Sequence, residues 1–80
     1  MTKEMINEIG NYLRENVEDF DFRVDLALKK MGKMRWSFDY ADCNLYDECY
    51  EKIEEWCEQN GIDTENEYIV DVEEIIFGMD

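Results

Sequence analysis

The first periodic stretch of apolar residues has the spacing of an α-helix. From Lys3 to Glu18, apolar side chains recur every three or four residues, which places them on one helical face. Thr2 stands just before this stretch and is a suitable N-cap. The pattern therefore predicts a helix over residues 3–18, whose apolar face consists of Met5, Ile6, Ile9, Tyr12, Leu13 and Val17.

From residue 20 onward the apolar positions alternate with mostly charged ones, as in a half-buried strand. The first alternating run contains Phe20, Phe22, Val24, Leu26 and Leu28, and the second contains Met34, Trp36, Phe38 and Tyr40. Gly32 lies between the two runs, where a tight turn would need it. The alternation predicts a β-hairpin with its turn at Gly32.

The helical period returns between residues 44 and 60. Seven apolar residues there fall within an arc of about 140° at 3.6 residues per turn. They are Leu45, Tyr46, Cys49, Tyr50, Ile53, Trp56 and Cys57. Asn44 is a suitable N-cap, and Gly61 can adopt the left-handed conformation that ends many helices. This pattern predicts a second helix.

The last stretch allows two interpretations. Tyr68, Val70 and Val72 alternate with more polar neighbours, which favours a third strand. Alternatively, Thr64 and Glu67 would form a capping box that starts a helix. That helix would carry one apolar face made of Tyr68, Ile69, Val72, Ile75, Ile76 and Met79. We favour the strand, because an isolated hairpin is marginally stable and a third strand lets a sheet bury one face.

These elements together predict a single compact α+β domain over residues 1–80. The expected order is α-β-β-α-β, with a three-stranded antiparallel sheet packed on two helices. The alternative replaces the last strand by a helix. The 80 residues include 45% apolar side chains, enough for a folded core, and contain no low-complexity run or linker that would divide it.

The composition argues against catalysis. The chain has no His, and Ser37 is its only Ser, so Cys-His and Ser-His pairs cannot be assembled. A chain this small also has little room for a catalytic pocket beside its core. We expect a protein that is not an enzyme and has no cofactor.

The cysteines do not predict a metal site or a disulfide. Cys43, Cys49 and Cys57 match no structural zinc spacing. On one helix, Cys49 and Cys57 would be about 12 Å apart, too far for a disulfide. We expect reduced thiols that serve as small buried residues. With no signal peptide or uncharged run long enough to span a bilayer, the chain is expected to be soluble and cytoplasmic.

A calcium loop is a weaker interpretation of the last stretch. Five acids between residues 63 and 74 fall at ligand positions of an EF-hand loop: Asp63, Glu65, Glu67, Asp71 and Glu74. Tyr68 occupies the position where the sharp turn needs Gly, so a chance alignment in an acidic segment is the simpler explanation.

Negative charge is concentrated in the second half of the chain. The formal net charge is -14, from 22 acids and 8 bases. Residues 1–38 contain seven acids and seven bases, whereas residues 39–80 contain fifteen acids and one base, Lys52. A net charge of about 2 to 8 already suffices for the solubility of a small domain. The excess indicates a surface that binds something basic, and argues against direct contact with nucleic acid or an anionic membrane.

Two rows of carboxylates are predicted to form this binding surface. The first follows the polar face of the second helix and the second follows one side of the proposed last strand. The rows consist of Asp47, Glu51, Glu54, Glu55 and Glu58, and of Glu65, Glu67, Asp71 and Glu73. Trp36 and Trp56 are expected to be buried and to hold the acidic elements rigid.

A basic cluster surrounds the predicted hairpin turn and has the opposite sign. It consists of Lys29, Lys30, Lys33 and Arg35. We expect it to offset the acidic half of the molecule, or to make a secondary contact with phosphate or with acids on a partner.

At the level of a class, these acidic rows resemble the small acidic phage-encoded inhibitors of bacterial defence, the anti-CRISPR and anti-restriction proteins, several of which are nucleic-acid mimics. The resemblance covers residues 47–58 and 65–74. It implies an inhibitor, monomeric or dimeric, that occupies the basic nucleic-acid groove of a CRISPR effector or another nuclease in the host cytoplasm. The alternative function is a small interaction module or oligomer subunit, joined through Tyr40, Tyr46, Tyr50 and Tyr68, whose acids serve only solubility.

Overall fold

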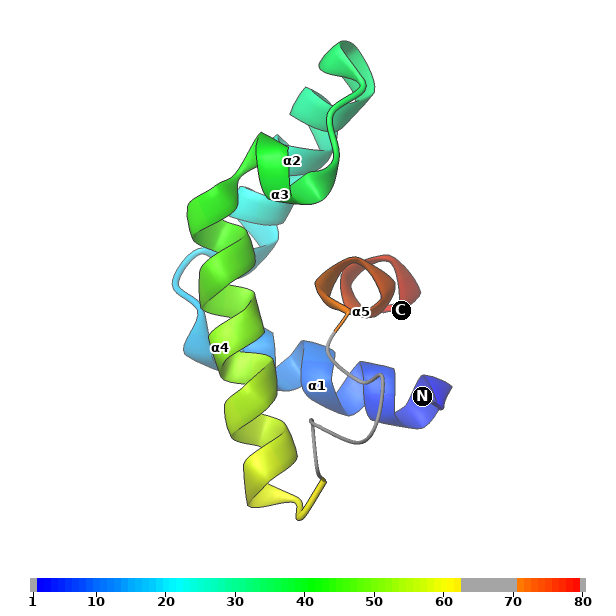
Figure 1. Cartoon of the computed structure of the whole chain (residues 1–80), viewed down its shortest axis with the longest axis vertical. Helices are drawn as coiled ribbons and strands as arrows, with labels where there is room; N and C mark the ends of the chain where they lie inside the picture. The colour runs from blue at the N-terminus through cyan, green and yellow to red at the C-terminus, as the bar shows by residue number, and fades with distance from the viewer. Residues whose placement is uncertain (1, 63–70, 80) are drawn as a thin grey trace.

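The computed structural model describes residues 2–62 and 71–79, and within these residues every regular element is a helix (Figure 1). The helices are α1 (Lys3–Asn16), α2 (Phe20–Met34), α3 (Phe38–Ala41), α4 (Cys43–Gln59) and α5 (Val72–Gly78). The predicted α+β class is therefore wrong: the described residues contain no strand and no sheet.

α1 and α4 confirm the two helices that the apolar spacing predicted. The Thr2 hydroxyl accepts a hydrogen bond from the Met5 backbone N–H at 3.2 Å and caps α1 as expected. Gly61 has φ 69°, in the left-handed region predicted for it. The N-cap of α4 is Asp42 and not Asn44, because the Asp42 carboxylate accepts from the Leu45 N–H at 3.0 Å.

The predicted hairpin is replaced by α2 and α3. α2 covers the whole first alternating run and ends beyond Gly32, which therefore lies within a helix and not in a turn. Phe20, Val24 and Met31, spaced by four and seven residues, face the core together with Ala27. This regular three-to-four spacing explains why the segment is helical although its apolar residues also alternate.

The second alternating run is divided between three environments. Met34 is the last residue of α2, Trp36 lies in the connection, and Phe38 begins the short helix α3. Phe38 is fully buried, whereas Trp36 is 46% exposed, so the expectation that Trp36 is buried was wrong. Trp56 on α4 is buried as predicted.

The C-terminal segment is helical where the structure describes it. Asp71 is the N-cap of α5, and its carboxylate accepts from the Glu74 N–H at 3.2 Å. Val72 is the first residue of the helix, which contradicts the strand proposed for residues 68–73 at its described end. The rest of that strand and the capping box at Thr64 and Glu67 lie outside the described residues.

One apolar core joins the five described helices. It contains residues from each of them, and its fully buried members include Ile9, Leu13, Phe38, Leu45 and Ile53. α1 packs against α4 and α5, while α3 packs against both α2 and α4. In Figure 1, α4 runs along the long axis of the molecule and α1 crosses its lower half. Gly10 of α1 makes room for the side chain of Met79, which follows α5, since a Cβ at Gly10 would lie 2.7 Å from that side chain.

The cysteines divide by position. Cys49 and Cys57 are fully buried on α4, whereas Cys43 is exposed at the start of that helix, so its predicted burial was wrong. Burial raises the pKa of the Cys49 thiol from 9.0 to about 12. Cys49 is therefore a neutral core residue at physiological pH, and Cys43 is the accessible thiol.

Candidate functional site

Four carboxylates form a single row along the outward face of α4. They are Asp47, Glu51, Glu54 and Glu58, at spacings of four, three and four residues. At 100° per residue they fall within an arc of about 60°, and the row is about 16 Å long. All four are exposed and lie roughly opposite the buried face that carries Leu45, Cys49 and Ile53.

The rest of α4 explains why this row is held in place. Its buried face is anchored to the core at five positions over a little more than three turns: Leu45, Cys49, Ile53, Trp56 and Cys57. Because a helix is stiff over this length, the four outward carboxylates keep a fixed spacing of about 5–6 Å between neighbouring Cβ atoms. The helix therefore sets the relative positions of the four Cβ atoms before any partner binds.

No ion pair between the described residues neutralises the row. The cations nearest to α4 are occupied by other acids: Arg23 pairs with Glu48, and Lys52 Nζ lies 3.2 Å from Glu55 Oε2. The negative charge of Asp47, Glu51, Glu54 and Glu58 is thus directed outward into solvent.

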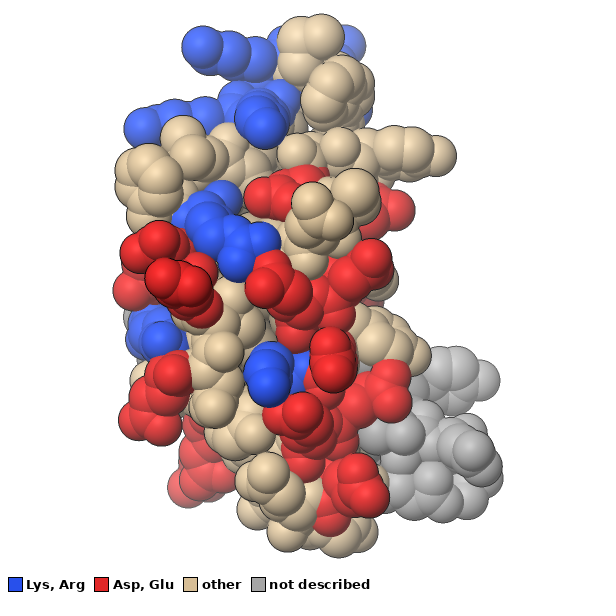
Figure 2. All heavy atoms as spheres, turned by 90° about the vertical axis from the view of Figure 1, so that its left-hand side faces the viewer, with Lys and Arg blue, Asp and Glu red and all other residues tan. Residues whose placement is uncertain are grey.

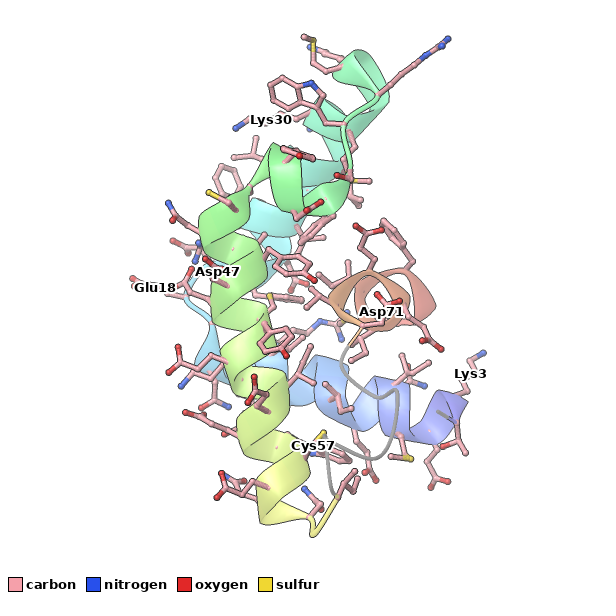
Figure 3. The ribbon with its side chains drawn as sticks, viewed as in Figure 1. Lys3, Glu18, Lys30, Asp47, Cys57 and Asp71 are labelled. Atoms are coloured by element: carbon pink, nitrogen blue, oxygen red, sulfur yellow. The ribbon has the colours of Figure 1, made fainter. Side chains whose placement is uncertain are left out.

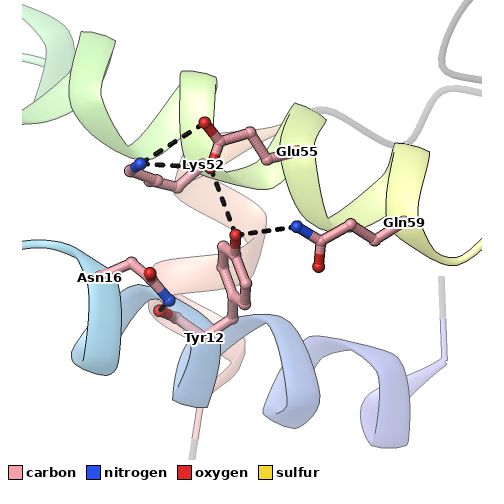
Figure 4. Close-up of polar contacts among 5 residues, drawn as sticks. All are labelled: Tyr12, Asn16, Lys52, Glu55 and Gln59. Carbon is pink, nitrogen blue, oxygen red and sulfur yellow. Dashed lines mark hydrogen bonds and ion pairs between the residues drawn. The ribbon is translucent and has the colours of Figure 1, made fainter.

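Glu55, which the sequence placed in the same row, has a different role. It is half-buried beside α1, where the Tyr12 hydroxyl donates to Glu55 Oε2 at 3.2 Å (Figure 4). Gln59 Nε2 donates in turn to the Tyr12 hydroxyl at 3.4 Å. Lys52 also donates a hydrogen bond to Glu55, and this bond raises the pKa of Lys52. Glu55 therefore joins α4 to α1 and is not part of the outward row.

Glu48 likewise connects two helices. Arg23 Nη2 of α2 pairs with Glu48 Oε2 of α4, and this contact raises the pKa of the Arg23 guanidinium. Glu48 was not among the candidate residues predicted from the sequence. Its partner lies 25 residues away, so no local spacing pointed to the contact.

Only two of the four residues of the second predicted row, Asp71 and Glu73, lie within the described residues, and they belong to the start of a helix and not to a strand. Asp71 caps α5 and Glu73 is partly buried in its first turn, while Glu65 and Glu67 lie outside the described residues. Asp71 and Glu73 instead approach α4 near Tyr46. Burial, followed by the charges of Asp39, Asp71 and Glu73, raises the pKa of the Tyr46 hydroxyl.

An aromatic strip separates these acids from the row on α4. Tyr46 and Tyr50 lie about one turn apart on that helix, and Tyr50 is 40% exposed. At 100° per residue, the side of α4 that carries them lies between the buried position of Ile53 and the side that carries Asp47 and Glu54. The surface therefore combines negative charge with exposed tyrosine, which can contribute area at low entropic cost.

The basic cluster lies at the opposite end of the molecule from the C-terminal end of α4 (Figure 1). Figure 2 shows a group of Lys and Arg side chains at the upper end of this face, and Asp and Glu side chains spread over its middle and lower parts with a few further basic side chains among them. Lys29 Nζ pairs with Asp25 Oδ2 at 3.0 Å, and Lys30, Lys33 and Arg35 are exposed around the C-terminal end of α2. Figure 3 shows the separation between Lys30 at this end and Asp47 and Asp71 farther down.

The described residues offer little for a small ligand or a metal. One shallow, open pocket of about 270 Å³ is lined by Asn7, Asn11, Arg14 and Met79. Arg14 already pairs with Asp21 at 3.2 Å, so its charge is partly used. Within residues 2–62 and 71–79, no group of three Cys, Asp or Glu side chains could hold a metal ion. The calcium loop proposed for residues 63–74 falls mostly outside them.

Comparison with protein-family models, with curated proteins and with solved structures finds no match. Of the described helices, none is both long enough and apolar enough to cross a membrane. On the described surface, the row on α4 is the most regular arrangement of charge.

Proposed function

We propose that this protein is an acidic inhibitor that binds the basic nucleic-acid groove of a bacterial defence nuclease. The observation that carries the proposal is the row of four unpaired carboxylates on one stiff helix. Such a row presents a phosphate-like field to Lys and Arg side chains in a groove. The anti-CRISPR and anti-restriction proteins, which the chain resembles in its acidic composition, would be functional analogues acting in the host cytoplasm.

Preorganisation is what makes the row suitable for binding. A flexible acidic tail would lose conformational entropy when it binds, whereas a helix anchored on its inner face loses little. Release of counterions from the basic groove would supply affinity without any readout of base sequence. Tyr50, exposed beside the row, would add apolar contact.

The test is inhibition of DNA cleavage by a panel of purified CRISPR effectors and restriction nucleases. The triple variant E51K/E54K/E58K reverses the charge of three of the four residues in the row and raises the net charge from -14 to -8. The matched control E4K/E8K/E15K makes the same change of charge on exposed positions of α1. We expect stoichiometric inhibition of at least one nuclease, weakened about 100-fold or more by the α4 variant and much less by the α1 variant.

Far-UV circular dichroism of both variants will show whether each retains its helices. Equal inhibition by the two folded variants would contradict the role of the α4 row. Failure of the wild-type protein to inhibit any nuclease in the panel would contradict the proposed class of target.

Salt dependence distinguishes this function from the alternative interaction module. The exposed residues Tyr40 (78%) and Tyr50 (40%) favour an apolar contact. If four ion pairs drive binding, the logarithm of the affinity should fall with the logarithm of salt concentration at a slope of about -3 to -4. An apolar interface predicts a slope close to zero.

A further inference from the structure

The outward face of α2 exposes large apolar side chains. Phe22 is 66% exposed and Leu26 is 43% exposed, and they lie four residues apart on the same side of the helix. Lys29 and Lys33 continue this side, because the spacing 22, 26, 29, 33 follows the three-to-four repeat. α2 thus has two faces: one packs into the core through Phe20 and Ala27, and the other is open.

Charge along α2 and the turn before it is polarised. The acids come first and the bases last: Glu18, Asp19, Asp21 and Asp25, followed after Arg23 by Lys29, Lys30, Lys33 and Arg35. This segment contains four acids and five bases, so it is close to neutral in a chain of net charge -14. It is the part of the described surface that a second copy of the same chain can approach with least repulsion.

We propose that the protein self-associates through this face, with α2 packed antiparallel against α2 of a second copy about a two-fold axis that crosses the outward face between Phe22 and Leu26. Such an axis places a residue at 24 − n opposite the partner's residue at 24 + n. Phe22 then faces Leu26 of the partner subunit, and the same contact repeats across the axis. The two central layers of the interface are apolar.

The same register pairs opposite charges at both ends. Glu18 and Asp19, in the turn that precedes α2, then lie at the level of Lys30 and Lys29 of the partner subunit, where Lys29 also keeps its ion pair with Asp25 of its own helix. Because the interface is symmetric, each pair occurs twice. An antiparallel arrangement therefore satisfies the polarity of α2, whereas a parallel arrangement would place like charges together.

A second copy fits this face better than an anionic ligand does. Nucleic acid or an acidic lipid surface would meet the bases at the C-terminal end of α2, but also the acids Glu18 and Asp19 in the turn that precedes the helix. A second copy presents both signs in the order needed.

The expected dimer is weak. α2 has 15 residues and is about 22 Å long, so one helix pair buries less than the roughly 800 Å² per partner of a standard interface. Repulsion between two chains of net charge -14 opposes association and is screened within about 8 Å at physiological salt. Dimerisation should therefore show at high protein concentration and moderate salt.

Sedimentation equilibrium of the full chain between about 10 μM and 1 mM, in about 0.15 M salt, measures this association. We expect a reversible monomer–dimer equilibrium for the wild-type protein. The variant F22Q/L26Q should dimerise at least about tenfold more weakly, because it removes both central apolar layers while keeping good helix formers. The control L28Q/M34Q changes two exposed apolar residues on other sides of α2 and should behave like the wild type.

Charge exchange tests the antiparallel register. E18K/D19N reverses or removes the acids, with Asn at position 19 because that residue has φ 54°. K29E/K30E reverses the bases. Each variant alone should dimerise more weakly than the wild type, and an equimolar mixture should recover association, since each end then pairs opposite charges.

A wild-type protein that is monomeric at about 1 mM would overturn the proposal. So would equal weakening by F22Q/L26Q and its control, or a mixture that does not recover. Flotation with anionic phosphatidylserine vesicles tests the membrane alternative. The self-association proposal would also be overturned if the wild-type protein binds these vesicles, F22Q/L26Q does not bind them, and no dimer forms. The triple variant E51K/E54K/E58K should dimerise at least as well as the wild type, so this test is separable from that of the inhibitor function.

Discussion

α2 and α4 are helices of similar length in the same small domain, yet their outward faces are opposite in chemistry. The outward face of α4 carries only charge of one sign along Asp47, Glu51, Glu54 and Glu58. That of α2 carries Phe22 and Leu26 between an acidic and a basic end. The two proposals assign these faces different roles: the acidic face of α4 would bind a basic partner, and the outward face of α2 would contact a second copy of the chain.

The largest effect on stability should come from truncating an apolar side chain on the buried face of α4, compared with the same change on the outward face of α2. Ile53 on α4 is fully buried, so Ile53→Ala should lower the free energy of unfolding by about 2–5 kcal/mol. Leu26 on α2 faces solvent in the monomer, so Leu26→Ala should change it by no more than about 0.5 kcal/mol. Urea denaturation of dilute protein measures both. Equal losses would mean that α2 packs differently from the structure.

High pH should weaken the anchoring of α4. The folded state holds the pKa of Cys49 at about 12, against 9.0 ordinarily, so above pH 9 the unfolded state loses this proton first. Stability is fully present below pH 9 and falls as the pH rises toward 12. Urea denaturation at a series of pH values should show this fall, and Cys49→Ala should reduce it. An unchanged pH profile in the variant would assign the fall to other groups, such as Tyr46.

The thiols offer an independent measure of the same burial. Cys43 is exposed, whereas Cys49 and Cys57 are fully buried. In native protein, a thiol reagent should modify Cys43 rapidly and the other two only after local or global unfolding. Mass spectrometry over time resolves the three sites. Rapid modification of Cys49 in native protein would show that the inner face of α4 is not closed.

A smaller effect is expected at the start of α4. Asp42→Ala removes the carboxylate that accepts from the Leu45 N–H and should lower stability by about 1 kcal/mol. Asn44→Ala is the matched control, since the structure places Asn44 inside the helix, where Ala is at least as favourable. If Asn44→Ala were the more harmful change, the cap would be at Asn44.

The smallest effects should have opposite signs on the two helices. E51Q/E54Q/E58Q relieves like-charge repulsion along α4 and should raise stability by about 0.5 kcal/mol, whereas Asp25→Asn breaks the ion pair with Lys29 and should lower it by about 0.3 kcal/mol. Both differences should shrink in about 1 M salt. A row that stabilised the fold would instead give the same sign on both helices.

The sequence predicted α1 and α4 because their apolar spacing extends over several turns without a competing pattern. It failed at α2 because Phe22, Leu26 and Leu28 are apolar and exposed. Their presence turned the core spacing of Phe20 and Val24 into an apparent alternation. The run from Ala27 to Met31, composed of strong helix formers, was a signal for the helix. Weighted against the alternation, it would have favoured the observed structure.

The candidate site was predictable where it depends on helical geometry alone. Asp47, Glu51, Glu54 and Glu58 share one face because of their spacing within α4. The role of Glu55 was not predictable, since its partner Tyr12 lies 43 residues away on α1. The role of Asp71 was predictable, because Asp71 followed by Glu74 just before Ile75 and Ile76 is a capping box.

The most direct test of the central claim is to map the surface that contacts an inhibited nuclease. Amide chemical shifts of isotopically labelled protein should change along α4 at Asp47, Glu51, Glu54 and Glu58 when the nuclease is added, and addition of its DNA should reverse these changes. The outward face of α2 should remain unaffected. Changes confined to α2 or α1, with α4 unperturbed, would contradict the account.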